Sequence, residues 1–136
     1  MSNNQLTTNF HLREFKCNDG TEVPCELLAN IGVLAAQLQV IRDFLSEQYK
    51  DEFPNGVRLT LVSAYRTDSY NEKVGGSPKS QHKKAKAGDL VSEVLSPKQL
   101  SLVIKKLIKE KKIIQGGVGL YPSFVHYDTR GTEARW

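Results

Sequence analysis

Residues 116–128 read Gly-Gly-Val-Gly-Leu-Tyr-Pro-Ser-Phe-Val-His-Tyr-Asp, with β-branched and aromatic residues on both sides of Pro122. This pattern predicts two strands joined by a turn, as in an antiparallel hairpin. Because side chains alternate between the two faces of a strand, His126 and Asp128 would share one face of the hairpin. The face of the sheet is expected to hold the site.

Two further strands and two long helices are predicted upstream. Residues 57–65 are rich in β-branched and aromatic residues, and residues 89–91 are read as a further strand. Apolar residues recur at steps of three and four over residues 25–49, as in a helix. Ser96-Pro97 begins a second helix that runs to about residue 111. These elements do not alternate as βαβ units, so the sequence predicts an α+β fold, an antiparallel sheet with helices packed on one side.

The length of 136 residues fits one domain over residues 1–136, with residues 1–10 frayed. The N-terminus lacks the basic and apolar segments of a secretory signal, so we expect synthesis in the cytoplasm. The most apolar stretch, residues 31–40, is interrupted by polar residues and glycine and falls short of the roughly 20 residues of a membrane span. We therefore expect no membrane partner.

The net charge of +4 and two lysine-rich runs, residues 79–86 and 105–112, would suit a polyanion such as nucleic acid or an anionic wall polymer. The second run follows helical spacing opposite apolar residues, which is typical of the solvent-exposed face of a helix. No aromatic residues interleave with the lysines, as they would in a nucleic-acid site. We expect no nucleic-acid partner and a monomeric protein.

Cys17 and Cys25 are separated by seven residues in a loop that contains glycine and proline. The spacing permits a disulfide if the loop folds back, and two packed thiols are an equal alternative. Two cysteines are too few for a structural zinc site, which normally takes four ligands.

His82, Asp89 and His126 are the residue types that bind a catalytic zinc ion. Such an ion takes three protein ligands and a water whose pKa falls to about 7. By itself the spacing is weak evidence, because isolated histidines are more often surface or packed residues.

Three motifs that surround these residues occur in order: Ser63-Ala64-Tyr65-Arg66-Thr67, the run from Ser80-Gln81-His82 to Asp89, and Phe124-Val125-His126-Tyr127-Asp128. With the flanking Tyr70-Asn71, Gly75-Gly76 and Ala134-Arg135-Trp136, they resemble the zinc D-alanyl-D-alanine carboxypeptidase family, the M15-type peptidases. The resemblance covers about residues 9–136. It implies the fold that this family shares with the hedgehog signalling domain and the vancomycin-resistance dipeptidases.

The resemblance implies that His82, Asp89 and His126 bind Zn²⁺ and that Arg66 is a cation facing the substrate. A guanidinium in this position can bind a terminal carboxylate or stabilise the oxyanion of the reaction. Ser80 is a candidate substrate-binding residue that ties down the loop entering the site, and a plain turn serine is an equal alternative.

The sequence departs from the family pattern at three positions. Ala85 replaces a glycine, at a cost of about 1 kcal/mol if the backbone there needs a positive φ. Gly88 replaces a small residue before Asp89. Ser123 stands where many relatives have the Asp or Glu that acts as general base, so Asp128 is the candidate for the base or for a partner that orients an imidazole.

The resemblance thus implies a zinc metallopeptidase that cuts peptidoglycan peptides near D-alanine, as a carboxypeptidase or an endopeptidase. It would reach the cell wall after release or delivery, and a phage or prophage origin is a reasonable hypothesis. The alternatives are a zinc-containing wall-binding module that has lost turnover and a structural phage-tail component.

Overall fold

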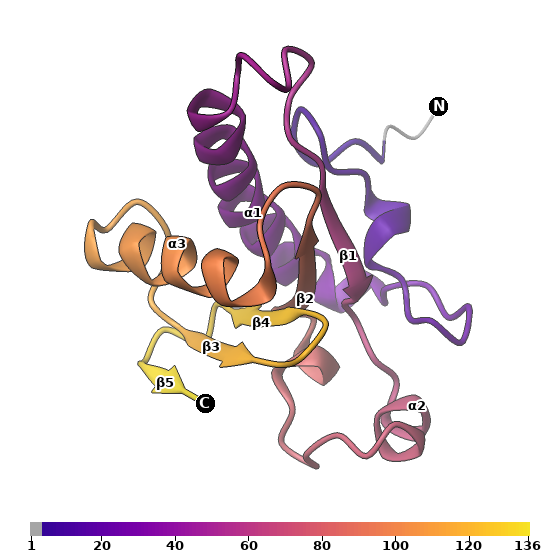
Figure 1. Ribbon diagram of the computed structural model, residues 1–136. Helices are drawn as coiled ribbons and strands as arrows, with labels where there is room; N and C mark the ends of the chain where they lie inside the picture. Colours follow the sequence, from indigo (N-terminus) through magenta and orange to yellow (C-terminus); the bar gives the residue numbers. More distant parts are fainter. Residues whose placement is uncertain (1–3) are drawn as a thin grey trace.

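The computed structural model describes residues 4–136, which form one mixed sheet and the helices that pack against it (Figure 1). The strands lie in the order β1-β2-β4-β3-β5. Their bounds are β1 (Leu59–Ser63), β2 (Ala87–Ser92), β3 (Gly117–Leu120), β4 (Val125–Asp128) and β5 (Ala134–Arg135). The α-helices are α1 (Leu28–Gln48), α2 (Asp68–Lys73) and α3 (Pro97–Lys109), and the 3-10 helices are η1 (Leu12–Phe15), η2 (Cys25–Leu27) and η3 (Gln81–Lys84). The predicted α+β fold is confirmed.

Helix α1 is the longest element, and its apolar stripe enters the core as the periodicity predicts. The fully buried residues of this stripe are Ile31, Leu34, Ala35, Leu38, Ile41 and Leu45. The stretch Cys25–Gln48 is long and apolar enough to cross a membrane by length and composition alone, with a mean hydropathy of 1.2 over its most apolar 18 residues. A core helix and an N-terminal signal sequence pass the same test, and in this structure the apolar stripe packs in the core.

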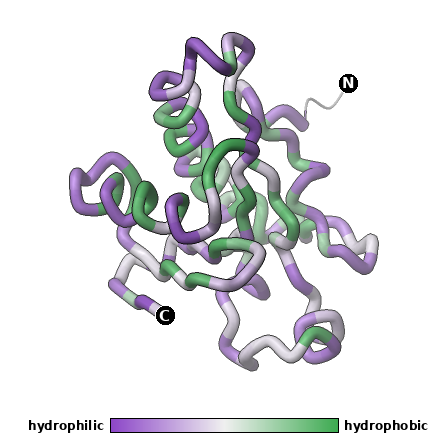
Figure 2. The backbone as a smooth tube through the Cα atoms, in the orientation of Figure 1, coloured by the Kyte–Doolittle hydropathy of each residue, from purple (hydrophilic) through white to green (hydrophobic). Residues whose placement is uncertain are grey.

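Helix α3 begins with the capping arrangement that Ser96-Pro97 predicts. The Ser96 hydroxyl accepts from the Gln99 backbone N–H (3.2 Å), and the Gln99 side chain accepts from the Ser96 N–H (2.9 Å). Its lysines face solvent while Leu100, Ile104 and Leu107 are buried. In Figure 2, green hydrophobic residues gather where the helices face the strands, and purple hydrophilic residues lie on the outside.

The sheet is antiparallel except at one edge, where β5 pairs with β3 in parallel, Gly117 opposite Ala134 and Val118 opposite Arg135. An entirely antiparallel sheet was expected from the sequence. After β4 the chain reverses over residues 129–133 and passes to the far side of β3, so β5 runs in the direction of β3. A strand of two residues carries no recognisable pattern.

The two faces of the sheet have different roles. Leu90, Val125 and Tyr127 point into the core that α1 and α3 cover. The residues that alternate with them, Asp89, His126 and Asp128, lie on the opposite face. The sheet therefore separates a hydrophobic core from a polar site.

Residues 4–10, for which the sequence predicts fraying, make ordered contacts with α1. The side-chain oxygen of Gln39 accepts from the Thr7 hydroxyl (2.8 Å) and from the Asn9 N–H (2.9 Å), and Phe10 is buried. The remainder of that expectation, residues 1–3, lies outside the described residues. Both cysteines are free thiols, Cys17 buried and Cys25 exposed, so the disulfide alternative does not hold in this structure.

Candidate metal centre and active-site cleft

The site is built on one row of residues that crosses the sheet. Ser63 of β1 lies opposite Asp89 of β2, Asp89 opposite His126 of β4, and His126 opposite Gly119 of β3. Cross-strand neighbours point to the same face, so strand pairing alone brings Asp89 and His126 together. The two residues are far apart in the sequence and adjacent in the sheet.

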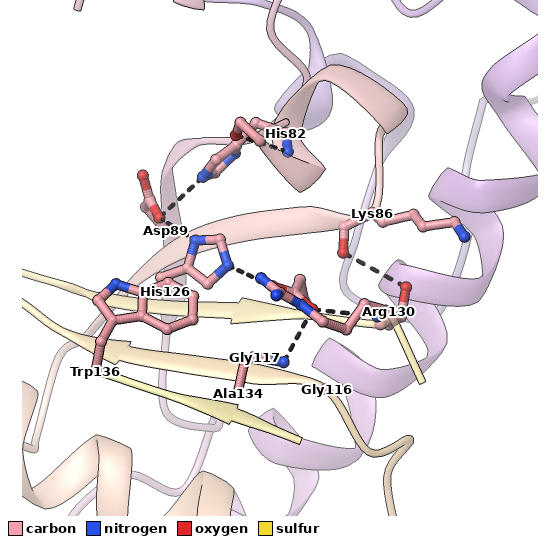
Figure 3. Close-up of polar contacts among 12 residues, drawn as sticks. His82, Lys86, Asp89, Gly116, Gly117, His126, Arg130, Ala134 and Trp136 are labelled. Carbon is pink, nitrogen blue, oxygen red and sulfur yellow. Dashed lines mark hydrogen bonds and ion pairs between the residues drawn. The ribbon is translucent and has the colours of Figure 1, made fainter. Parts of the chain in front are cut away.

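His82 joins this row from η3. The Ser80 hydroxyl caps η3 by accepting from the His82 N–H (3.2 Å), and the His82 carbonyl accepts from the Arg66 N–H (3.0 Å). These contacts fix the backbone of His82 above β2. Figure 3 shows the imidazoles of His82 and His126 next to the Asp89 carboxylate.

The three predicted metal ligands converge on one point. The Asp89 Oδ1 atom lies 3.2 Å from His82 Nε2 and 3.4 Å from His126 Nδ1. The three side chains are buried, and their ligand atoms all lie within 4.8 Å of one another. Ligands about 2.0–2.1 Å from a tetrahedral ion are separated by roughly 3.3 Å, which matches the two contacts to Asp89.

Hydrogen bonds on the outer side of each ring assign the proton to the nitrogen that faces away from Asp89. His82 Nδ1 lies 2.7 Å from the Ala64 carbonyl oxygen, which can only accept. His126 Nε2 lies 2.6 Å from Asp128 Oδ2 and donates to it. Three lone pairs, from His82 Nε2, His126 Nδ1 and Asp89 Oδ1, are then left facing one another. Such a donor set needs a cation between its members, and it fits a divalent metal ion.

The electrostatics of the site favour positive charge at this point. When a proton on a facing ring nitrogen takes the place of the cation, it donates to Asp89: burial opposes ionisation of this carboxyl, but the hydrogen bonds from His126 and His82 outweigh burial and lower its pKa to about 2. Burial also disfavours the charged form of His126, yet its hydrogen bonds with Asp128 and Asp89 raise its pKa. The carboxylate is thus ready to bind a cation near neutral pH.

Asp128 lies behind His126, away from the convergence point, and has no exposed surface. Its Oδ1 accepts from the Gly117 N–H (2.9 Å) and Arg130 Nε (2.9 Å), and its Oδ2 accepts from Arg130 Nη2 (2.8 Å) as well as from His126. Burial opposes its ionisation, but these donors outweigh burial and hold the pKa of Asp128 well below its usual range. Its geometry is that of a group that orients His126.

Arg66 lies beside the convergence point and is held from three sides. Its Nε, Nη1 and Nη2 atoms donate to Ser63 Oγ, Asn71 Oδ1 and Asp89 Oδ2, each at 3.2 Å. Asn71 is fixed in turn by donating to the Ser77 carbonyl (2.8 Å). One N–H on each of Nη1 and Nη2 is left over for a substrate.

A cleft of about 500 Å³ opens over the convergence point. Arg66, Ser80 and Gln81 line it on the side of the loop, and Tyr121, Arg130 and Trp136 line it on the side of the hairpin. Ser80 therefore reaches the cleft as well as capping η3. Ser123 lies in the turn between β3 and β4, is exposed, and is not among the residues that line the cleft.

Trp136 and Arg130 are cleft residues whose position the sequence did not predict. The centroids of the Trp136 and His126 rings lie 4.9 Å apart (Figure 3). A Cβ on Gly119 would collide with the Trp136 ring. The Trp136 Nε1–H donates to the Tyr121 hydroxyl (2.8 Å). The signal in the sequence was the alternation of Gly117 and Gly119 along β3. A side chain at either position would occupy the space that Arg130 and Trp136 fill.

The two substitutions in the ligand loop have different consequences. Ala85 has a φ of 58°, so it adopts the left-handed conformation that glycine accepts more easily, at a cost of about 1 kcal/mol. Gly88 points to the core, where an added Cβ would lie 2.6 Å from Leu61 Cδ2. Neither change alters the convergence of the three ligands.

A search among curated proteins found no match to this chain. A comparison with protein families matches residues 8–128 to the family described as Peptidase M15. The match includes His82, Asp89 and His126, and it covers most of the chain. The buried His-Asp-His group and this match agree, and the chain belongs to the peptidase M15 family.

Proposed function

We propose that this protein is a zinc-dependent peptidase that hydrolyses peptidoglycan peptides near D-alanine, at the cell wall. The family is one of metal-dependent peptidases, and the chain has a His-Asp-His group that could bind a metal. The observation that carries the proposal is the convergence of three lone pairs at the base of a cleft, beside an arginine with free donors.

Each residue has a role that follows from its contacts. His82, Asp89 and His126 would hold the zinc ion, which when bound supplies a Lewis acid and lowers the pKa of a water molecule to about 7. Arg66 would use its remaining N–H groups to bind a substrate carboxylate or to stabilise the developing oxyanion. Asp128 would keep the His126 ring in the metal-binding orientation, and Ser80 would hold the loop and contact the substrate.

A second candidate is a zinc-containing module that binds cell-wall peptides without cutting them. Among the residues of the described chain that line the cleft, Asp89 is the sole carboxylate, and it is a proposed ligand. Ser123 occupies the position of the usual base, and Asp128 has both oxygens engaged behind His126. These observations favour slow turnover or none.

The test is hydrolysis of acetylated peptides that end in D-Ala-D-Ala by the zinc-loaded protein, with a metal chelator as the control. The enzyme is expected to release D-alanine, and the chelator is expected to abolish the release. Cross-linked peptides assayed in parallel separate a carboxypeptidase from an endopeptidase. Tight binding of zinc and peptide without release of D-alanine or loss of wall turbidity would support the binding module instead.

Arg66→Lys is expected to retain the fold and zinc while kcat/KM falls about 100-fold. Lysine keeps the charge but cannot place donors on Ser63, Asn71 and Asp89 while presenting others to the substrate. The measurement is steady-state hydrolysis together with zinc content after dialysis.

Arg58→Lys is the matched control, because Arg58 is exposed just before β1 and does not line the cleft. It should behave as the wild type. An Arg66→Lys protein with wild-type kcat/KM would remove Arg66 from the proposed active site.

A further inference from the structure

The lysine run at residues 79–86 borders a second cavity beside the cleft. This cavity has a volume of about 600 Å³. Four of its lining residues also line the cleft: Lys79, Ser80, Gln81 and Arg130. The two cavities are therefore neighbours, and a ligand in the cleft lies next to the second cavity. None of the three proposed metal ligands lines the second cavity.

The second cavity has an excess of positive charge. Lys79, Lys83, Lys84 and Arg130 line it, together with a single acid, Asp68, which pairs with Lys83 (3.2 Å). Lys83 also donates to the Pro78 carbonyl (2.8 Å). Within residues 4–136, the ammonium groups of Lys79 and Lys84 make no hydrogen bond or ion pair, so both are available to a ligand.

Arg130 forms the border between the two cavities, and its orientation is fixed. Its Nε and Nη2 atoms both bind Asp128, and its guanidinium carbon lies 5.5 Å from the Trp136 ring. The Nη1 edge is left without a hydrogen-bond partner in the described chain. A planar guanidinium held in this way can bind a carboxylate without losing further side-chain freedom.

We infer that the second cavity is a subsite for a carboxylate of the peptide substrate, held by Lys79, Lys84 and the Nη1 edge of Arg130. This inference rests on the proposed function and adds to it: the preferred substrate is an acidic peptide. A peptide in extended conformation advances about 3.3–3.6 Å per residue, so an acidic residue near the scissile bond would reach the neighbouring cavity. The four shared lining residues place the second cavity next to the cleft, which favours the cleaved molecule itself as the source of the anion.

The test compares peptides that differ in one carboxylate. Acetylated peptides ending in D-Ala-D-Ala carry Glu at the first, second or third position before these residues, and each has a twin with Gln. For the wild type, at least one Glu peptide is expected to have a KM about 10-fold below that of its twin at low salt, with equal kcat.

The variant Lys79→Glu/Lys84→Glu is expected to lose this preference, raising KM for the Glu peptide about 10-fold or more while the Gln peptide changes little. Lys105→Glu/Lys109→Glu is the matched control, because it changes the net charge equally on exposed positions of α3. The control should keep the preference. Equal KM values for all twins in the wild type, or equal losses in both variants, would overturn the subsite.

The two proposals fail in different ways. If the wild type hydrolyses no D-alanyl peptide, the proposed function fails, and calorimetric binding of the Glu and Gln twins to the zinc-loaded protein still tests the subsite. Tighter binding of a Glu peptide that is lost in Lys79→Glu/Lys84→Glu would support it. Hydrolysis without any preference for Glu would instead reject the subsite and leave the peptidase intact.

Discussion

His82→Ala and His126→Ala proteins are expected to lose zinc affinity by more than about 100-fold. Removing a residue that only orients a metal ligand costs about 10- to 100-fold, and removing the ligand itself should cost more. Each change deletes one of the three lone pairs that converge on a single point. The wild type is expected to bind one zinc ion per chain. The measurement is metal content after dialysis, followed by competition with a chromogenic chelator.

His11→Ala is the matched control, because His11 is the third histidine of the chain and lies outside the site, where it caps η1 by accepting from the Arg13 N–H (3.2 Å). This protein should retain full zinc. If His82→Ala or His126→Ala also retains full zinc after dialysis, the assignment of the ligands is wrong, whatever the activity.

Asp128→Asn is expected to weaken zinc binding by roughly 10- to 100-fold and to destabilise the fold. Asparagine has a single acceptor oxygen. An amide NH2 in place of Oδ2 no longer accepts from His126 and Arg130 Nη2, and an NH2 in place of Oδ1 no longer accepts from Gly117 and Arg130 Nε. Breaking a buried ion pair costs about 3–5 kcal/mol. Because the Arg130 side chain keeps 28% exposure to water, we expect a smaller loss of roughly 2–4 kcal/mol. Chelator competition and urea unfolding at pH 7 measure the two effects.

The same variant separates the two roles that the sequence left open for Asp128. A general base would lose about 10²- to 10⁴-fold in rate while zinc affinity stays unchanged. Asp43→Asn, an exposed change on α1, serves as the control for the substitution itself. Unchanged rate, zinc affinity and stability in Asp128→Asn would contradict both roles.

The sequence predicts the elements that have a strong local signal. Helix α3 starts at Pro97 because Ser96 and Gln99 form a capping box, and α1 carries an apolar stripe over its whole length. The motifs that carry the family resemblance also point to the three residues that the structure brings together, His82, Asp89 and His126. In each case the decisive interactions lie within one element or within a short motif.

Other features depend on contacts between distant segments. The parallel pairing of β5 depends on the path of the loop after β4, which has no local pattern. Trp136 reaches the cleft because β5 lies next to β3, and Gly119 leaves room for its ring. The placement of Asp128 behind His126 is also tertiary, since spacing along the strand shows the shared face but not the partners Gly117 and Arg130.

Trp136 is the single tryptophan of the chain, and the aromatic wall that it forms gives the protein an intrinsic optical reporter. Its indole is half-exposed, lies 4.9 Å from the ring of a proposed metal ligand and contacts the guanidinium of Arg130. Its fluorescence will therefore respond to changes in charge and solvent at the cleft and to little else. Metal uptake and peptide docking can then be followed as separate emission changes in real time, without attaching a dye.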